Sequence, residues 1–125
     1  MFNTRTVNVG TGESKSYQRA TINSDASGIY GMILYPDDYA SEAKTSYTSA
    51  EWKTAESAGC VFLPAAGYRN GTSVDKVGFN GNYWYSSYYG KLSSYYLHFR
   101  SDGVWPADYY YRNNGFSVRL VRSVE

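Results

Sequence analysis

Tyrosine is the residue that most constrains how this chain can fold. The sequence has 15 tyrosines in 125 residues, and nine of them lie between residues 83 and 111. Each buried hydroxyl group needs a hydrogen-bond partner, so a core cannot easily absorb nine of them. We therefore expect much of this segment to lie at the surface, on a scaffold that other residues hold together.

The remaining composition excludes several kinds of site. The formal net charge of +1 does not indicate a nucleic-acid-binding surface. The single cysteine, Cys60, and the single histidine, His98, cannot build a zinc site, so we expect no metal and no cofactor. No run approaches about 18 apolar residues, and residues 1–5 lack the apolar core of a signal peptide, so we expect no membrane insertion.

The length is that of one ordinary domain, and local patterns predict its first elements. We expect a single domain over residues 16–125, preceded by an entry strand or a linker remnant at residues 1–15. Loose alternation at residues 17–22 and an apolar run at residues 28–35 predict strands. A capping-box pattern, in which Thr48 precedes Glu51 by three residues, predicts a helix over residues 49–58.

Two features that could suggest chemistry have simpler interpretations. Cys60 opens an apolar run at residues 60–64, which predicts a buried strand, and we interpret Cys60 as a small core residue in preference to a nucleophile. Asp37 and Asp38 could bind a cation, but a solvated turn explains them better. No nucleophile with a base and no carboxylate pair has a recognisable spacing, so we expect no catalytic site.

The second half is predicted to be a long structured loop followed by short strands. Recurring glycines at residues 65–81 indicate the loop. Strands are predicted at residues 83–87, 95–99 and 116–121, and residues 101–115 are polar and rich in turn-forming residues. The apolar positions of these elements predict the core residues Trp52, Phe62, Leu63, Leu97, Phe99, Val118 and Leu120.

The tyrosine-rich segment has the composition of a binding surface. Tyrosine, serine, glycine and asparagine with an occasional tryptophan or arginine are typical of antibody paratopes. If Leu97 and Phe99 face the core, His98 faces away from it, and a turn at residues 113–115 would return the chain beside the strand at residues 95–99. The rings could instead cover core edges or a subunit contact. The residues predicted to share one exposed face are Tyr88, Tyr89, His98, Arg100, Trp105, Tyr109, Tyr110 and Asn113.

An ordered set of motifs resembles a known superfamily. The set comprises Trp52 in a short helix, Val-Phe-Leu-Pro-Ala-Ala-Gly-Tyr-Arg at residues 61–69, Tyr83-Trp84, and Gly-Phe-Ser-Val-Arg-Leu-Val at residues 115–121. Together these motifs resemble the C-type-lectin-like, formylglycine-generating-enzyme-like superfamily. Within it, the chain is similar to the variable proteins of diversity-generating retroelements in gut Bacteroides and their phages. The resemblance covers about residues 29–122.

The resemblance implies an α+β, C-type-lectin-like fold with small antiparallel sheets, one or two short helices and long structured loops. In such proteins a rigid scaffold displays side chains on a C-terminal surface. We expect this chain to bind a protein or glycan ligand of a host or partner cell through that surface, on its own or as a homo-oligomer. The implied location is a phage tail in the virion or the bacterial cell surface. The implied ligand-binding set is Tyr88, Tyr89, Lys91, Ser93, Tyr96, His98, Arg100, Asp102, Trp105, Asp108, Tyr109, Tyr110, Asn113 and Asn114, with Phe116 at its margin.

Two departures from the superfamily limit what the resemblance implies. The enzymatic branch depends on cysteine chemistry of its own, whereas this chain has only Cys60. Calcium-dependent lectins carry Glu-Pro-Asn or Gln-Pro-Asp with Trp-Asn-Asp, and none of these occurs in this sequence. We therefore expect a non-enzymatic, calcium-independent recognition domain. The alternative is a structural or adhesion module whose aromatic face makes subunit or domain contacts.

Overall fold

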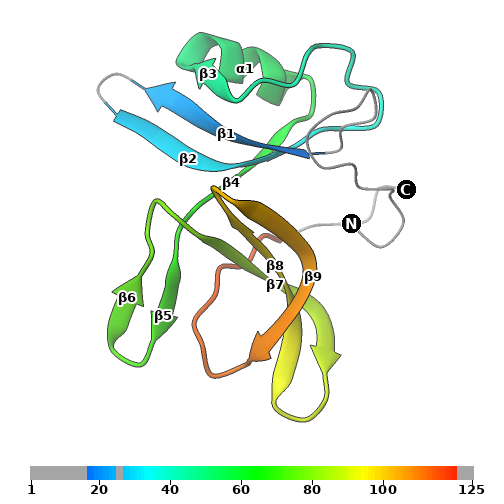
Figure 1. Ribbon diagram of the computed structural model, residues 1–125. Coiled ribbons are helices and arrows are strands. Elements are labelled where there is room, and N and C mark those ends of the chain that lie inside the picture. Colours follow the sequence, from blue (N-terminus) through cyan, green and yellow to red (C-terminus); the bar gives the residue numbers. More distant parts are fainter. Residues whose placement is uncertain (1–16, 25–26, 121–125) are drawn as a thin grey trace. The chain divides into compact units, whose positions relative to one another are not determined.

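The computed structural model describes residues 17–24 and 27–120, which fall into two compact units. Unit 1 is Met1–Ala65 and unit 2 is Ala66–Glu125 (Figure 1). The described part of the chain is mostly strand with one short helix, as expected for the α+β class. The predicted entry segment at residues 1–15 lies outside the described residues.

Unit 1 contains a four-stranded sheet in the order β3-β1-β2-β4. The strands are β1 (Tyr17–Ser24), β2 (Ser27–Leu34), β3 (Ser46–Thr48) and β4 (Val61–Pro64). β1 pairs with β2, and β2 with β4, in antiparallel fashion, whereas β3 runs parallel to β1. The three strands predicted in this half are confirmed, and the short parallel strand β3 makes the sheet mixed.

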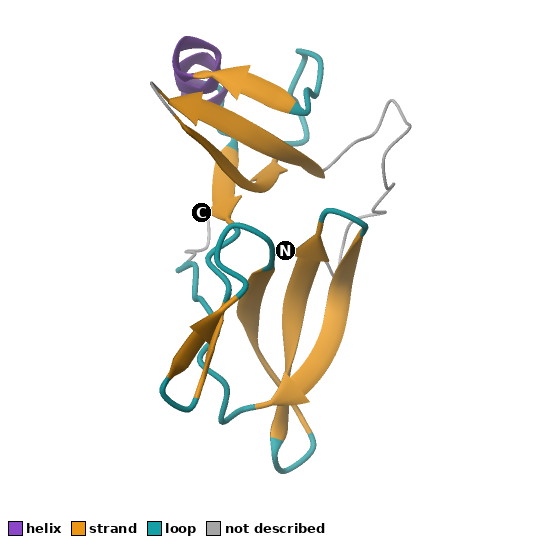
Figure 2. Ribbon diagram, turned by 60° about the vertical axis from the view of Figure 1, so that its left-hand side comes forward, coloured by secondary structure: helices purple, strands orange, loops and turns teal. Residues whose placement is uncertain are grey.

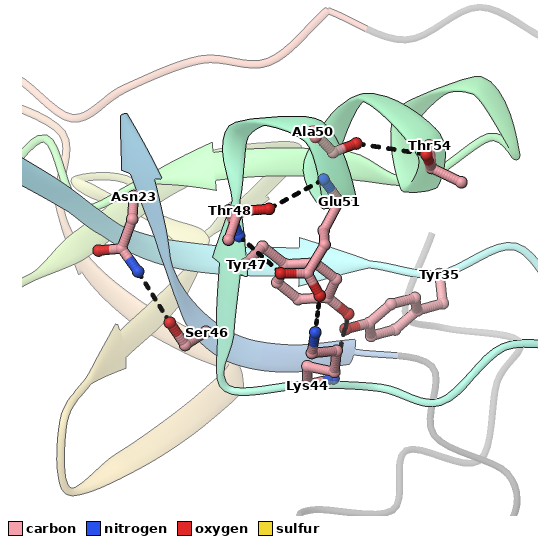
Figure 3. Close-up of polar contacts among 9 residues, drawn as sticks. All are labelled: Asn23, Tyr35, Lys44, Ser46, Tyr47, Thr48, Ala50, Glu51 and Thr54. Carbon is pink, nitrogen blue, oxygen red and sulfur yellow. Dashed lines mark hydrogen bonds and ion pairs between the residues drawn. The ribbon is translucent and has the colours of Figure 1, made fainter. Parts of the chain in front are cut away.

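Helix α1 (Ser49–Ser57) begins directly after β3 because Thr48 caps it. The Thr48 hydroxyl accepts from the Glu51 N–H at 3.2 Å, and the Glu51 carboxylate accepts from the Thr48 N–H at 3.1 Å (Figure 3). This reciprocal pair satisfies two N–H groups that the first turn leaves without helical partners. Glu51 also forms an ion pair with Lys44. The helix predicted from the capping box is therefore confirmed.

The core of unit 1 combines aliphatic and aromatic side chains. The ring of Trp52 lies 6.4 Å from that of Tyr47 and 5.8 Å from that of Phe62, and both Trp52 and Phe62 are partly buried against the core. Leu63 is buried as predicted. Cys60 is also buried, and burial raises the pKa of its thiol, which suits the predicted core role.

Unit 2 contains a short hairpin and a three-stranded antiparallel sheet. The hairpin pairs β5 (Tyr68–Asn70) with β6 (Ser73–Asp75), inside the segment predicted to be a structured loop. The sheet has the order β7-β8-β9, from β7 (Gly81–Tyr89), β8 (Ser93–Arg100) and β9 (Gly103–Tyr111). Figure 2 shows these strands as long, twisted neighbours. The predicted strands at residues 83–87 and 95–99 are confirmed.

Residues 101–115 were predicted to be a turn-rich stretch between strands, but β9 occupies most of this stretch. Its polar composition resembled a loop, but tyrosine and tryptophan have high strand propensity. Pro106, which has no N–H, is tolerated because β9 is an edge strand and carries a register shift near this residue. The tyrosine-rich segment is therefore sheet on both sides of the β8–β9 turn.

The strand predicted at residues 116–121 is also wrong over residues 116–120, and Val121 lies outside the described residues. Only isolated bridges form here, between Arg69 and Gly115 and between Tyr83 and Ser117. Because no strand pairing continues through these residues, alternate side chains are not held toward a core. Val118 and Leu120, predicted to be buried, are 64% and 88% exposed. Leu97 and Phe99 are buried as predicted.

Candidate ligand-binding site

The strand register assigns the side chains of the β7-β8-β9 sheet to two faces. Side chains of directly paired residues lie on the same face of a sheet. Tyr96 pairs with Trp84 and Asp108, and Tyr95 pairs with Tyr109. We call the side that carries Tyr96 the pocket face and the opposite side the stack face. The pocket face carries Asn82, Trp84, Tyr88, Ser94, Tyr96, His98, Arg100, Trp105, Asp108 and Tyr110; the stack face carries Tyr83, Tyr89, Ser93, Tyr95, Leu97, Phe99, Val104, Tyr109 and Tyr111.

Ring contacts on the stack face agree with this division. The rings of Tyr89 and Tyr109 stack at 4.1 Å, and Tyr95 meets Tyr89 edge to face at 5.4 Å. The prediction that eight residues converge on one face is therefore wrong, because Tyr89 and Tyr109 lie opposite their sequence neighbours. Tyr109 and Tyr110 are consecutive in a strand, and consecutive side chains point to opposite faces.

A pocket of about 190 Å³ lies on the pocket face of unit 2. Its most buried side chains are Asn82 and Tyr96, which are 2% and 6% exposed, whereas Tyr110 is 48% exposed. Residues of β5, of the sheet and of the segment after β9 contribute to the lining. The lining residues are Tyr68, Asn70, Asn80, Asn82, Tyr96, His98, Tyr110, Asn114 and Phe116.

Phe116 is the centre of the aromatic wall. Its ring stacks on Trp84 at 4.3 Å and lies 4.7 Å from the ring of Tyr96. Tyr110 and Tyr68 lie slightly farther away, at 6.2 Å and 6.1 Å. Mutually packed rings lose little further side-chain freedom when a ligand binds, so this wall is preorganised.

Asn82 and His98 form the polar part of the pocket floor. The Asn82 Nδ2 donates to the Gly67 carbonyl at 3.4 Å, which leaves the Asn82 Oδ1 to accept from the His98 Nδ1 at 2.7 Å. A neutral His98 then carries its proton on Nδ1 and offers Nε2 as an acceptor. Burial, and then the nearby Arg100, lower the pKa of His98, which favours this neutral form. His98 was predicted to be exposed, and the structure places it half-buried.

The charged side chains of the pocket face are paired with their neighbours. The Tyr96 hydroxyl donates to Asp108 at 3.4 Å, and burial followed by the Asp108 charge raises the pKa of Tyr96. Arg100 forms a two-point ion pair with Asp102 at 3.0 and 3.2 Å and lies 4.7 Å above the Trp105 ring. The contacts of Arg100 hold the end of the face beside the β8–β9 turn in a fixed arrangement.

The pocket gathers four of the fourteen residues predicted to bind a ligand: Tyr96, His98, Tyr110 and Asn114. Another four lie elsewhere on the pocket face, three lie on the stack face, and three lie in turns. In that order, these groups are Tyr88, Arg100, Trp105 and Asp108; Tyr89, Ser93 and Tyr109; and Lys91, Asp102 and Asn113. The predicted return of the chain beside β8 is wrong, since Gly115 bridges Arg69 in β5 and Ser117 bridges Tyr83 in β7.

Four lining residues were missed by reasoning from the sequence: Tyr68, Asn70, Asn80 and Asn82. They belong to the glycine-rich stretch predicted to be a structured loop and to the strand that follows it. The available signal was that a loop of this length usually has a function. What the sequence could not show is that the hairpin formed by β5 and β6 brings Tyr68 and Asn70 to the same pocket as Tyr110.

A family model described as "Domain of unknown function (DUF8237)" matches residues 37–121. The match covers more than half of the chain and all nine pocket-lining residues, so the chain belongs to this family. No curated protein and no solved structure matches the chain. Within residues 17–24 and 27–120, no group of three or more His, Cys, Asp or Glu side chains could hold a metal ion. No helix among these residues is long and apolar enough to cross a membrane.

Proposed function

We propose that this member of the DUF8237 family is a non-enzymatic recognition module that binds its ligand on the pocket face of unit 2. The observation that carries the proposal is the pocket itself, which has a buried polar floor, a packed aromatic wall and an exposed tyrosine rim. Concave sites with aromatic linings and a few fixed polar groups are the usual form of ligand sites in proteins. Binding is non-covalent.

The resemblance to C-type-lectin-like variable proteins supports the same function and belongs to the proposal. In this view the fold is C-type-lectin-like, and the module acts at a phage tail or on a bacterial cell surface. Its ligand is then a protein or a glycan of a host or partner cell. The mixture of small sheets, one helix in the described residues and loops lining the pocket is compatible with that fold.

Tyr109 and Tyr110 offer a matched experiment. They are adjacent in β9 and are 50% and 48% exposed, yet they lie on opposite faces. The purified full chain would be tested on arrays of bacterial and mammalian glycans and on a displayed random-peptide library. We expect Tyr110→Ala to weaken binding by more than about 1 kcal/mol and Tyr109→Ala to leave it unchanged. Absence of binding to both collections, or an equal loss in the two variants, would refute the proposal.

The stack face supports the second candidate, a structural or adhesion module. Tyr89, Tyr109 and Tyr111 are 43%, 50% and 59% exposed and lie on this face. Exposed, prestacked rings are typical of protein contact surfaces. If this candidate is right, Tyr89→Ala will change the molar mass measured by light scattering at high concentration. If the ligand instead binds on the pocket face, as in the leading proposal, Tyr89→Ala will have the same molar mass as the parent chain.

A further inference from the structure

The chemical character of the pocket restricts the ligand that it can hold. Five lining residues are aromatic or imidazole rings and four are asparagines, so none of these nine described residues is charged when His98 is neutral. A charged ligand would lose its hydration here without gaining a countercharge, which is unfavourable. The pocket therefore selects a neutral ligand.

The asparagines further require a ligand rich in groups that both donate and accept hydrogen bonds. A side-chain amide offers two N–H donors and one carbonyl acceptor. Within the described residues, no hydrogen bond engages the amides of Asn70 and Asn80, while Asn114 donates to the Tyr111 carbonyl at 3.1 Å and keeps its own oxygen available. A purely apolar group inserted here would leave these amides without partners, at a cost that disfavours it.

Rings and amides together match a sugar. One face of a pyranose ring presents C–H groups that pack on an aromatic ring, and its edge presents neighbouring hydroxyl groups that each donate and accept. The Tyr110 ring at the rim and the Phe116 ring within the wall supply aromatic surface, and Asn80 and His98 Nε2 supply polar partners. The volume of about 190 Å³ is below the roughly 300–1,000 Å³ of pockets for drug-sized ligands. It suits one sugar unit.

The surface next to the pocket leaves room for the further units of a longer saccharide. A second, wider hollow of about 640 Å³ shares Asn80 with the pocket and is lined by residues before β7 and in the β8–β9 turn. Unlike the pocket, this hollow carries charged side chains, among them Lys76 and Arg100. A glycan whose terminal unit occupies the pocket could therefore extend past Asn80 into a polar environment.

We propose that the pocket on the pocket face of unit 2 binds a neutral saccharide unit, held by the amides of Asn70, Asn80 and Asn114 and stacked on Tyr110. This inference rests on the proposed function, since it names the ligand class of that same site. A displayed peptide is the rival ligand and is an outcome of the test below.

The full chain would be titrated by calorimetry with glucose, galactose, mannose, N-acetylglucosamine and N-acetylgalactosamine, with sialic acid as the charged comparison. We expect at least one neutral sugar to bind saturably and sialic acid not to bind. Asn80→Ala and Asn80→Asp should each weaken the sugar at least tenfold, because both remove the amide donor. Tyr109→Ala on the opposite face should bind as the parent does. Thermal melting of each variant shows whether it is folded. Tyr110→Ala is the second test variant. Tyr109→Ala is its matched control, because the two tyrosines are similarly exposed.

The outcomes separate this inference from the function on which it rests. If no neutral sugar binds, or if Asn80→Ala and Asn80→Asp bind the sugar as tightly as the parent, the saccharide inference is wrong. If displayed peptides bind, lose affinity in Tyr110→Ala and are not displaced by any sugar, the pocket face is a protein-binding surface and only the saccharide inference fails. If neither sugars nor peptides bind, both proposals fail.

Discussion

In unit 1 the rings of Tyr35 and Tyr47 are each 2% exposed and their hydroxyl groups hydrogen-bond to each other at 2.8 Å, as Figure 3 shows. In unit 2, by contrast, Tyr109 and Tyr110 are about half exposed. A buried tyrosine requires a partner for its hydroxyl, whereas an exposed one finds water. The difference shows that tyrosine can belong to a core where another protein group partners its hydroxyl. At the surface it needs no such partner.

The two units also differ in what stabilises them. Unit 1 has a mixed core in which Ala20, Ile22 and Ile33 pack with aromatic rings under a capped helix. Unit 2 has a three-stranded sheet whose buried side chains include Leu97 and Phe99. Most of its aromatic rings lie on the pocket face or the stack face of this sheet. The stability of a small sheet depends strongly on each buried side chain, because the sheet has few of them.

The largest effect that this comparison predicts is at Phe99, which is 0% exposed and stacks with Tyr83 at 6.4 Å. Phe99→Ala should lower the free energy of unfolding by about 3–5 kcal/mol, as expected when a buried ring leaves a cavity. Denaturant titration would measure it. Phe79→Ala is the matched control, since Phe79 is 70% exposed and should change stability by less than about 0.5 kcal/mol. Similar losses in both variants would contradict the assigned core of unit 2.

In unit 1 the next largest effect is expected at the helix cap. Thr48→Ala removes the hydroxyl that accepts from the Glu51 N–H, and loss of such a cap typically costs about 1 kcal/mol. Thr54→Ala is the control, because Thr54 is exposed within α1 and only donates back to the Ala50 carbonyl. Alanine also has a higher helix propensity than threonine. Chemical denaturation should therefore rank Thr48→Ala well below Thr54→Ala in stability, and the reverse order would show that the cap is unimportant.

A pair of hydroxyl deletions tests the contrast between the two kinds of tyrosine. Tyr35→Phe removes one partner of the buried hydroxyl pair and should lower the free energy of unfolding by about 1 kcal/mol. The Tyr47 hydroxyl still accepts from the Lys44 N–H, so the loss stays moderate. Tyr110→Phe, at an exposed position, should change stability by less than about 0.5 kcal/mol. Equal effects in the same denaturant assay would remove the distinction between the units.

Local patterns were sufficient to predict most elements of unit 1. The capping box at Thr48 and the apolar run that became β2 are encoded within a few residues, and both are confirmed. In unit 2, β9 was missed because its tyrosines, aspartate and proline resemble a loop until an edge-strand position is known. An edge strand pairs on one side only, so it tolerates residues that an inner strand would not.

The candidate site depended still more on information absent from the local sequence. Alternation separates Tyr109 from Tyr110 only where the segment is a strand, and the prediction that both lie on one face lacked that information. The contribution of Tyr68 and Asn70, in contrast, depends on how β5 is held by the Gly115 bridge more than forty positions away in the chain. No spacing rule specifies such a contact, which is why half of the pocket could be predicted and the other half could not.

The smallest predicted effect concerns pH and the floor of the pocket. Burial and the Arg100 charge lower the pKa of His98 below its ordinary value of 6.5, and these outweigh the opposing effects of Asp108, Asp102 and a backbone hydrogen bond with Gly81. Between the lowered pKa and 6.5 the unfolded chain binds more protons at this site than the folded chain, so stability rises with pH across that window. The stability that the neutral His98 contributes is complete above about pH 6.5. It is lost as pH falls through the pKa of His98 in the folded chain.

His98 is the only histidine in the sequence, so denaturant titrations between pH 5 and 7 report mainly on it. We expect the free energy of unfolding to decline as pH falls in this range, and we expect His98→Gln to show a smaller slope whatever its absolute stability. The half-buried position of His98 accounts for the direction, since a second proton would put a charge on a ring that is partly removed from water. A parent chain that became more stable on acidification would show that His98 is protonated in the folded state, and the neutral pocket floor would then be wrong.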